Sequence, residues 1–525
     1  MKRRNFLKIP ALGGLAFMMR GLPIRAYAQS PLLNAVAKAT QANGRVLVLI
    51  QLNGGNDGIN TIVPLDQYSA LSAVRPNVLV SDSKILSLSG IQNTGMHPAM
   101  SAIRGMYNDG LVNVVQAVGY AQPNFSHFRS TDIWTTGSDA DEYLNTGWLG
   151  RYLDNEYAGY PNGYPNNNMP DPLAIQIGTG MSNVLQGPNI NMGYAIANVN
   201  SFYNLVNNSV GTAPNTAAGH ELTFIRNIAQ QTQGYTASIQ QATGAAQNLG
   251  AYPAGNSLAD QLKIVAQLIA GGLQTSIYVV NLGGFDTHAN QVEGADKTSG
   301  PHAALLKLLS EAVSAFFTDL KMMHIDDRVT AMTFSEFGRR IKSNNSGGTD
   351  HGSAAPLMVF GPNVNPRILG HNPVISPNTS VEDNIPMQFD YRQVYASVLT
   401  DWFGVTPQVL NNVLGHDYAT LAIFKGSMAT EAETVTAVAS DELLGQNYPN
   451  PFSRNTTVSF TSKGGAVTLQ VFDISGRLVK TVLEETYGPG RHEATIDRSG
   501  LAAGNYLYRL TNGSDQTTKK MIVID

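Results

Sequence analysis

The sequence predicts a large α/β domain, with a mostly parallel sheet and helices on both faces, followed by a small all-β sandwich. Three observations predict this arrangement. Five apolar runs are typical of strands buried on both faces, helical patterns lie between several of them, and residues 445–525 alternate in hydrophobicity. The length of 525 residues also exceeds that of a usual single domain.

The five apolar runs are mostly continuous, as expected where helices cover both sides of a sheet. They are RVLVLIQL (45–52), LVNVVQAV (111–118), TSIYVVNL (275–282), DRVTAMTF (327–334) and PLMVF (356–360). SLADQLKIVAQLIAGG precedes the third run and HAALLKLLSEAVSAFFTDLKMM (302–323) precedes the fourth, both with apolar residues at helical spacing. In such open sheets, ligands bind at the carboxyl ends of the strands.

Composition narrows the chemistry. The chain has no cysteine, which excludes disulfides, thiolate metal sites and cysteine nucleophiles. Hydrophobic residues make up 43% and charged residues 14%, which is typical of a globular protein with a lightly charged surface. Any reaction therefore depends on oxygen and nitrogen groups.

Residues 1–28 predict an export signal peptide. They combine a basic start, an apolar middle and the small residues Ala26 and Ala28 at a cleavage position. The run RRNFLK is twin-arginine-like, although Lys2 stands where that pattern usually has Ser or Thr. An ordinary secretory signal is the alternative. The distinction matters because twin-arginine cargo folds before export, so a metal would be loaded in the cytoplasm.

Removal of the signal peptide would make the chain more acidic. Residues 1–28 contain six Lys or Arg and no acidic residue, which leaves 28 basic and 38 acidic residues and a net charge of −10. This charge argues against nucleic acid as a partner. No later run reaches the roughly 18 apolar residues of a membrane helix, so no transmembrane helix is expected in the mature chain.

The end of the chain changes character after about Lys425. The segment 426–444 is rich in small and acidic residues and is typical of a linker. Residues 445–525 then alternate, with Val467, Leu469 and Val471 on one face and Gly-rich turns between strands, which predicts a β-sandwich.

Five motifs in this sandwich resemble a known sorting domain. They are NYPNPF (447–452), VFDISGRLVKTV (471–482), GRHEATID (490–497), LAAGNYLYRL (501–510) and the terminal KKMIVID. Together they resemble the type A sorting domain of the type nine secretion system of Gram-negative bacteria. The resemblance implies that this machinery is a partner and that the chain is exported through the periplasm, then secreted or attached to the cell surface. A carbohydrate-binding or spacer sandwich is the alternative.

Polar groups follow four of the predicted strands. The segments NGGNDGIN, GYAQPNFSHFRSTDIW, GGFDTHANQ and SEFGRRIKSNNSGGTDHGSAA carry the polar groups of Asp57, Ser126, His127, Asp286, His288, Glu336, Asp350 and His351. Divalent cations such as Zn, Mn, Ca or Mg bind these groups, so one rim of the sheet is expected to hold metal. Each motif alone is weak evidence for a metal site, because an Asp or Ser after a strand often only caps the following helix.

The same segments resemble an exported bacterial family over roughly residues 41–425. QLNGGNDGINTIVP, the SHF of FSHFRSTDIWTTG, GWLGRYLD, GGFDTHANQ, FSEFGRR and GTDHGSAAPLMVFG stand in the order of the family catalogued as domain of unknown function 1501. This family is related to the alkaline phosphatase and sulfatase superfamily, so an alkaline phosphatase-like fold is implied. In that superfamily an Asp after the first strand and a hydroxyl or modified Cys at a helix start share one metal, while an Asp and two His hold another.

Carried over, the resemblance implies roles for single residues. Asp57 would hold the first metal and Ser126 would be the nucleophile, with Ser130 and Thr131 as rivals. Asp286, His288 and His351 would hold the second metal, with Asp350 beside them. Glu336 and Phe337 stand where many relatives have an Asp-His pair, which removes one imidazole. Arg339 or Arg340 would clamp the substrate's oxygens, although such a pair is more often a surface feature.

These roles predict an exported, metal-dependent hydrolase of phosphate or sulfate esters. Two alternatives stay open. One is a non-catalytic surface protein of the same fold that binds a cation or an anionic glycan. The other is a serine hydrolase with Ser-His-Asp chemistry, although the chain lacks a G-x-S-x-G elbow in this region. Residues 155–255, rich in Asn, Gln, Gly and Tyr, are expected to form an insertion or cap that shapes the substrate pocket.

Overall fold

The computed structural model describes most of two units, Met1–Ala432 and Glu433–Asp525. The described residues are 17–19, 22–24, 44–178, 180–196, 235–376, 378–427 and 444–524 without 446, 448, 449, 451, 475 and 514. Of the predicted signal peptide, only the antiparallel pair β1 (Phe17–Met19) and β2 (Leu22–Ile24) is described. The rest of the signal peptide, most of the linker and part of the predicted insertion lie outside the described residues.

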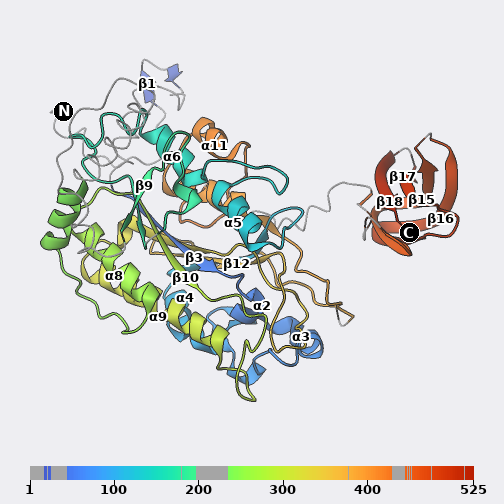
Figure 1. The fold of residues 1–525 in the computed structure, drawn as a ribbon, viewed down its shortest axis with the longest axis horizontal. Coiled ribbons are helices and arrows are strands. Elements are labelled where there is room, and N and C mark those ends of the chain that lie inside the picture. Colours follow the sequence, from blue (N-terminus) through green and yellow to red (C-terminus); the bar gives the residue numbers. More distant parts are fainter. Residues whose placement is uncertain are drawn as a thin grey trace, which may run out of the picture. The chain divides into compact units, whose positions relative to one another are not determined.

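A nine-stranded mixed sheet forms the centre of the first unit (Figure 1). In sheet order its strands are β13 (Ile368–Leu369), β7 (Val112–Gly119), β12 (Ala355–Phe360), β11 (Val329–Phe334), β3 (Val46–Asn53), β10 (Ile277–Gly283), β8 (Ala174–Ile177) and β9 (Gly193–Ile196), and β14 (Phe389–Asp390) pairs with β7. All pairings are parallel except those of β12 with β11 and β7. The carboxyl ends of β3, β7, β10 and β11 therefore meet at one rim, and the residues before β12 reach the same rim.

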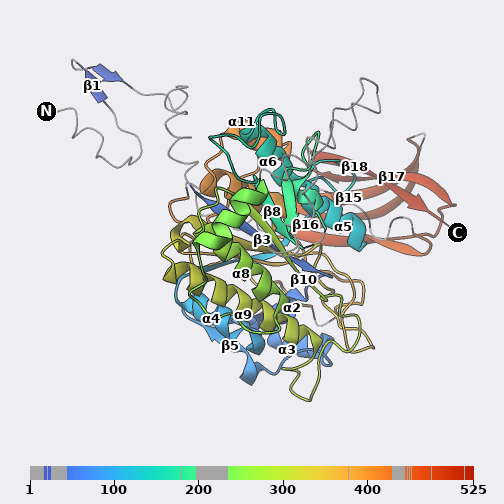
Figure 2. The same cartoon turned by 60° about the vertical axis from the view of Figure 1, so that its left-hand side comes forward.

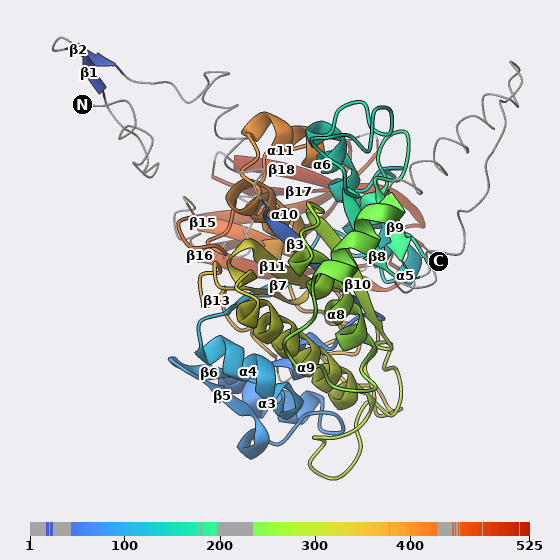
Figure 3. The same ribbon diagram turned by 90° about the vertical axis from the view of Figure 1, so that its left-hand side faces the viewer.

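Helices cover both faces of this sheet, as the sequence predicts. On β3, Val46, Val48 and Ile50 point into one apolar core, and Leu47 and Leu49 point into the other. The first core is completed by α4 (Ser101–Asn108), α8 (Ser257–Ala270) and α9 (Pro301–Met322), and the second by α5 (His127–Thr136), α6 (Trp148–Glu156), α10 (Tyr391–Ser397) and α11 (Pro407–Leu414). Figures 2 and 3 show these layers from two further directions.

A small subsheet extends the first unit. It contains β4 (Ile62–Pro64), β6 (Ile91–Met96) and β5 (Leu86–Leu88), in that order, and the short helices α2 (Gly58–Thr61) and α3 (Tyr68–Val74) precede and follow β4. Among the helices that the structure describes, none combines the length and the apolarity needed to cross a membrane.

The second unit has a core of its own. Its strands are β15 (Asn455–Asp473), β16 (Leu478–Asp497), β17 (Gly504–Asn512) and β18 (Asp515–Val523), which form an antiparallel sheet in the order β16-β15-β17-β18. Val467, Leu469 and Val471 are fully buried in this core, as their alternation predicts. The all-β prediction is confirmed, but the named strands of the described residues form one sheet, whereas a sandwich would have two.

Candidate metal centre

Three side chains from distant parts of the sequence meet at the rim. His127 lies at the start of α5, Asp286 follows β10 and His351 precedes β12, and one ligand atom from each lies within 4.8 Å of the others. The carboxylate of Asp286 is the centre of the group. Its Oδ2 is 3.5 Å from Nε2 of His127, and its Oδ1 is 3.3 Å from Nε2 of His351 and 2.8 Å from Nδ1 of His288.

Two hydrogen bonds orient the imidazoles of His127 and His351. Nδ1 of His127 is 2.8 Å from Oε1 of Glu336, and Nδ1 of His351 is 2.7 Å from the carbonyl oxygen of Phe125. Carboxylate and carbonyl oxygens only accept, so both Nδ1 atoms donate and both Nε2 atoms of the neutral rings carry lone pairs. A lone pair that faces a carboxylate repels it unless a proton or a metal cation lies between them. The arrangement therefore fits a metal ion, with Glu336 and Phe125 as the orienting partners that metal-bound histidines usually have.

Electrostatics favour the metal-binding forms of Asp286 and His351. Burial raises the pKa of Asp286, but the hydrogen bond and charge of Arg339, followed by His351 and His288, outweigh it and lower this pKa to about 2. The pKa of His351 is lowered, first by burial and further by the charge of Arg339. An ionised carboxylate and a neutral imidazole are the states that bind metal.

Glycines allow the loops of the centre to approach one another closely. At Gly54, where φ is +120°, a Cβ would lie 2.3 Å from the backbone nitrogen of Asp286. At Gly348, a Cβ would lie 2.4 Å from the carbonyl carbon of His288. Gly54 of NGGNDG and Gly348 of GGTDHG are thus required by backbone packing around the site, beyond any need of a turn.

Asp57 lies outside this cluster, which corrects its predicted role. Its side chain is fully buried, and Arg75 binds both carboxylate oxygens at 3.1 and 3.0 Å. Gln291 donates a further hydrogen bond of 2.6 Å to Oδ2. Burial raises the pKa of Asp57, but the charges of Arg75 and His302 and these hydrogen bonds lower it overall. Because both oxygens are already bound, we remove Asp57 from the candidate ligands.

Arg339 also has a different environment from the predicted one. Its guanidinium is buried and donates to the carbonyl oxygens of Gly54, Gly55, Phe285 and Thr349 and to Oδ1 of Asp286. It therefore ties the loops together and holds Asp286, and it is not exposed to a substrate. Arg340 binds the carbonyl oxygen of His351 and Glu382.

The remaining acidic candidates have separate roles. Glu336 is 2% exposed, and its Oε1 accepts hydrogen bonds from the backbone of Gly54 and from His127, so it supports the candidate ligand His127 and is not part of the cluster itself. Asp350 is exposed and accepts a hydrogen bond of 2.8 Å from Asn344, outside the cluster.

The hydroxyl groups of the three candidate nucleophiles differ in how accessible they are to a substrate. Ser126 is exposed at the N-cap of α5 and its side chain makes no capping hydrogen bond. Ser130 is buried, bonded to the hydroxyl of Tyr120 and to the carbonyl of Glu336. Thr131 lines a neighbouring cavity. Ser126, whose chain neighbours Phe125 and His127 both contact the centre, is therefore the candidate that remains. Within the described residues no hydrogen bond joins it to a histidine, as a Ser-His-Asp triad would need.

The sequence analysis places His127 among the polar groups at the strand ends but gives it no role as a ligand. A signal is present, because the SHF motif follows the second strand, but the superfamily plan points to the adjacent serine. In the structure the ring of His127 lies 4.4 Å from that of His351 and 4.9 Å from that of Phe337. His127 thus supplies an imidazole to a centre in which position 337 has none.

Comparison with known proteins identifies the C-terminal unit. Residues 446–524 match the family described as the secretion system C-terminal sorting domain. The chain is therefore exported by the type IX system, and it is secreted or attached to the cell surface. No curated protein matches the chain.

Solved structures show only distant similarity. PorZ, a surface component of the type-IX secretion system of Porphyromonas gingivalis, is 16% identical over 15% of this chain, which spans 11% of PorZ, with a TM-score of 0.12. A Bacteroides thetaiotaomicron protein described with the metabolism of multiple glycosaminoglycans is 11% identical, with 83% and 89% of the two chains covered and a TM-score of 0.36. A Vibrio parahaemolyticus member of the alkaline phosphatase superfamily is 10% identical, with 92% and 83% covered and a TM-score of 0.33.

The first unit has a family match that covers most of its length. Residues 45–414, more than half of the chain, match the family described as protein of unknown function, DUF1501. This range contains every strand of the central sheet and every residue of the candidate metal centre. The chain belongs to the DUF1501 family.

Proposed function

We propose that this exported chain is a metal-dependent hydrolase of phosphate or sulfate esters. The observation that supports the proposal most is the convergence of two imidazole lone pairs and an ionised carboxylate on an open rim. The side chains of His127 and Asp286 are 34% and 47% exposed, so a substrate can reach them. Catalytic metal sites usually combine three protein ligands with one open position, whereas structural sites are closed.

The proposed ligands favour a particular kind of ion. His127, His351 and Asp286 would hold it, and we place His288, which lies beside Asp286, outside the set of ligands. Imidazole suits zinc and other transition metals, whereas calcium and magnesium prefer oxygen ligands alone. Among the four ions expected from the sequence, we therefore propose Zn or Mn. When bound, such an ion polarises the ester and stabilises charge on its oxygens.

The chain itself supplies the other groups of the proposed reaction. Ser126 presents an exposed hydroxyl as the proposed nucleophile. Because Ser126 is the N-cap of α5, the free backbone N–H groups of the first turn favour a phosphate or sulfate group beside it. His288 is 43% exposed at the centre and is the candidate for protonating the leaving alcohol.

Metal analysis and ester hydrolysis test the proposal together. We expect the purified chain to hold a transition metal and to cleave p-nitrophenyl phosphate or p-nitrophenyl sulfate. His127→Ala should lose the ion and reduce kcat/KM by roughly 100-fold or more. His416→Ala, at an exposed histidine outside the centre, is the matched control and should change neither quantity. A wild-type chain that holds no ion and cleaves neither ester after addition of Zn or Mn removes the proposal.

A non-catalytic binding protein is the second candidate, and one observation favours it. Two residues that would complete an esterase of this plan, Asp57 and Arg339, are buried in internal pairings. Ion binding without turnover, and anionic glycan binding that is unchanged in Ser126→Ala, would support this alternative.

A further inference from the structure

One face of the central sheet changes from apolar to polar at the carboxyl ends of three adjacent strands, β3, β10 and β8. The apolar residues Leu47, Leu49, Ile277, Val279 and Ala174 pack in the core beside α5 and α6, and the next residues on the same face are Gln51, Asn53, Asn281 and Gln176. Side chains alternate between faces along a strand, so these four amides point the same way. The opposite face of these strands is apolar as far as the strand ends, because its last residues pack in the other core: Ile50, Leu52, Val280 and Leu282.

The fold does not use most of these amide groups. No hydrogen bond within the described residues involves the side chains of Gln51, Asn53 or Asn281. Gln176 is 8% exposed, and its side-chain oxygen accepts a hydrogen bond of 2.6 Å from the backbone of Ser182. Its NH₂ group makes no hydrogen bond within the described residues. Gln51, Asn53 and Asn281 are partly exposed, so their amide groups are accessible to a ligand. Amide groups from three adjacent strands that face the same way and are available for hydrogen bonds indicate a site for a polar ligand.

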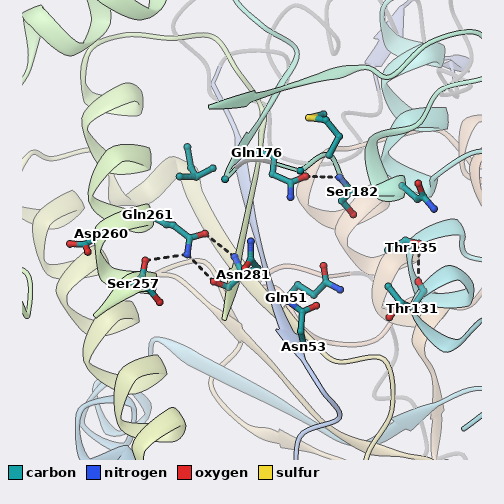
Figure 4. Close-up of a pocket in the computed structure, with 15 residues that line it drawn as sticks. Gln51, Asn53, Thr131, Thr135, Gln176, Ser182, Ser257, Asp260, Gln261 and Asn281 are labelled. Carbon is teal, nitrogen blue, oxygen red and sulfur yellow. Dashed lines mark hydrogen bonds between the residues drawn. The ribbon is translucent and has the colours of Figure 1, made fainter. Parts of the chain in front are cut away.

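The amides form one wall of a cavity of about 740 Å³ (Figure 4). Thr131 and Thr135 of α5 line it on one side, and Ser257, Asp260 and Gln261 of α8 line it on the other. Gln261 is held in place by two hydrogen bonds with the backbone of Asn281. The volume lies within the roughly 300–1,000 Å³ range of small-molecule sites.

The lining selects a class of ligand. Of its fifteen residues, Asp260 alone has an ionisable side chain, and none is Lys, Arg or aromatic. A phosphate or another anion would find no positive charge there, and an apolar ligand would leave the amides without partners. Amides and hydroxyls donate and accept hydrogen bonds at the same time, as the hydroxyl groups of a sugar do.

Helix α5 connects this cavity to the candidate metal centre. His127, Thr131 and Thr135 are spaced four residues apart, so they lie on one face of the helix. The first belongs to the metal centre and the other two line the cavity. One turn of helix, about 5.4 Å, separates the two regions. A sugar ester is long enough to span this distance.

We propose that this cavity binds the uncharged sugar ring of an esterified glycan while its phosphate or sulfate group lies at the metal centre. The inference rests on the proposed function and names the substrate class. It is tested with neutral sugars that carry no ester: galactose, mannose, N-acetylglucosamine, lactose and cellobiose, each measured by saturation-transfer NMR and calorimetry on the full chain.

Three variants locate the sugar. Asn281→Leu and Gln51→Leu replace the amide with an apolar side chain, and each should weaken the binding of the sugars at least tenfold. Gln408→Leu, an exposed amide on α11, is the matched control and should bind as the wild type does. Thermal unfolding of each variant checks that the fold is retained.

The outcomes separate this inference from the proposed function. Sugar binding that persists in His127→Ala and is lost in Asn281→Leu supports the cavity, even if the wild type holds no metal and cleaves no ester. Ester cleavage without binding of any sugar in the panel overturns it. Sugar binding that is unchanged in both cavity variants overturns it too, as does binding of the peptide Gly-Asn-Ser-Gly in place of the sugars.

Discussion

At the scale of single residues, the pairing of each carboxylate with an arginine decides which carboxylate stays available to bind a metal ion. Asp57 and Asp286 follow parallel strands that end at the same rim. Arg75 occupies both oxygens of Asp57 in a buried pair, whereas Arg339 binds one oxygen of Asp286 and leaves its carboxylate 47% exposed. Sequence alone predicts the two positions as equivalent, because the partner of each carboxylate is a guanidinium brought close only by the fold.

Loss of the Asp57 carboxylate should affect stability before it affects the metal. We expect Asp57→Ala to lower the free energy of unfolding by about 3–5 kcal/mol, because it leaves the buried charge of Arg75 without a partner. Urea denaturation measures this change. The folded fraction should retain its ion. Ion loss with unchanged stability would return Asp57 to the set of ligands.

Two buried histidines should make stability depend on pH. Burial lowers the pKa of His302 to about 4 and that of His97 to about 3. In the unfolded chain these histidines bind protons below about pH 6.5. In the folded chain they bind protons only when the pH falls to the lowered pKa values. The free energy of unfolding should therefore fall as the pH drops from 6.5 toward 4, by up to about 1.4 kcal/mol per unit for each histidine.

Denaturation at pH 7 and pH 5 measures this dependence. In His302→Gln the difference between the two pH values should shrink, because one buried imidazole is gone. His416→Gln removes an exposed histidine and should leave the difference as in the wild type. An equal slope in wild type and His302→Gln contradicts the assignment.

At the scale of elements, the sequence predicts the strands and their polar ends well. The continuous apolar runs correspond to β3, β7, β10, β11 and β12, and the predicted helix 302–323 corresponds to α9. The direction of β12 could not be predicted, because a strand buried on both faces has the same apolar pattern whether it runs parallel or antiparallel. That direction brings His351, before the strand, to the rim where other strands end.

The glycine loop after β3 should be needed for metal binding. In Gly54→Ala the new Cβ would meet the backbone of Asp286, so we expect ion affinity to fall at least tenfold, which corresponds to about 1.4 kcal/mol. Gly90 has φ of +78° and no atom lies within 4 Å of the place where a Cβ would be, so Gly90→Ala introduces backbone strain alone. Gly90→Ala should lose stability and keep the ion, as titration with zinc would show. Equal ion affinity in both variants contradicts this role.

At the scale of the whole molecule, the two units have separate hydrophobic cores. The core of the C-terminal unit runs from Leu444 to Val523, and the cores of the first unit contain no described residue beyond Phe424. The composition change after Lys425 predicts this boundary from sequence, because a linker buries too few apolar groups to fold.

Removal of residues 433–525 should therefore separate export from the metal centre. We expect the shortened chain to keep its ion, because the cores of the first unit contain no described residue of the second. The melting temperature of the first unit should stay within about 2 °C, since 1 kcal/mol corresponds to roughly 1 °C in a domain of this size. In the native host it should no longer be found at the cell surface or in the medium. Loss of the ion on truncation would show that the second unit supports the centre.

The spread of the metal ligands along the chain has a consequence for biosynthesis. His127, Asp286 and His351 come from segments that meet only when β7, β10 and β12 have all joined the sheet. A growing polypeptide on the ribosome has no such site until the last of these strands emerges. The ion can therefore bind only after this unit has folded, either in the compartment where folding is completed or in a later one.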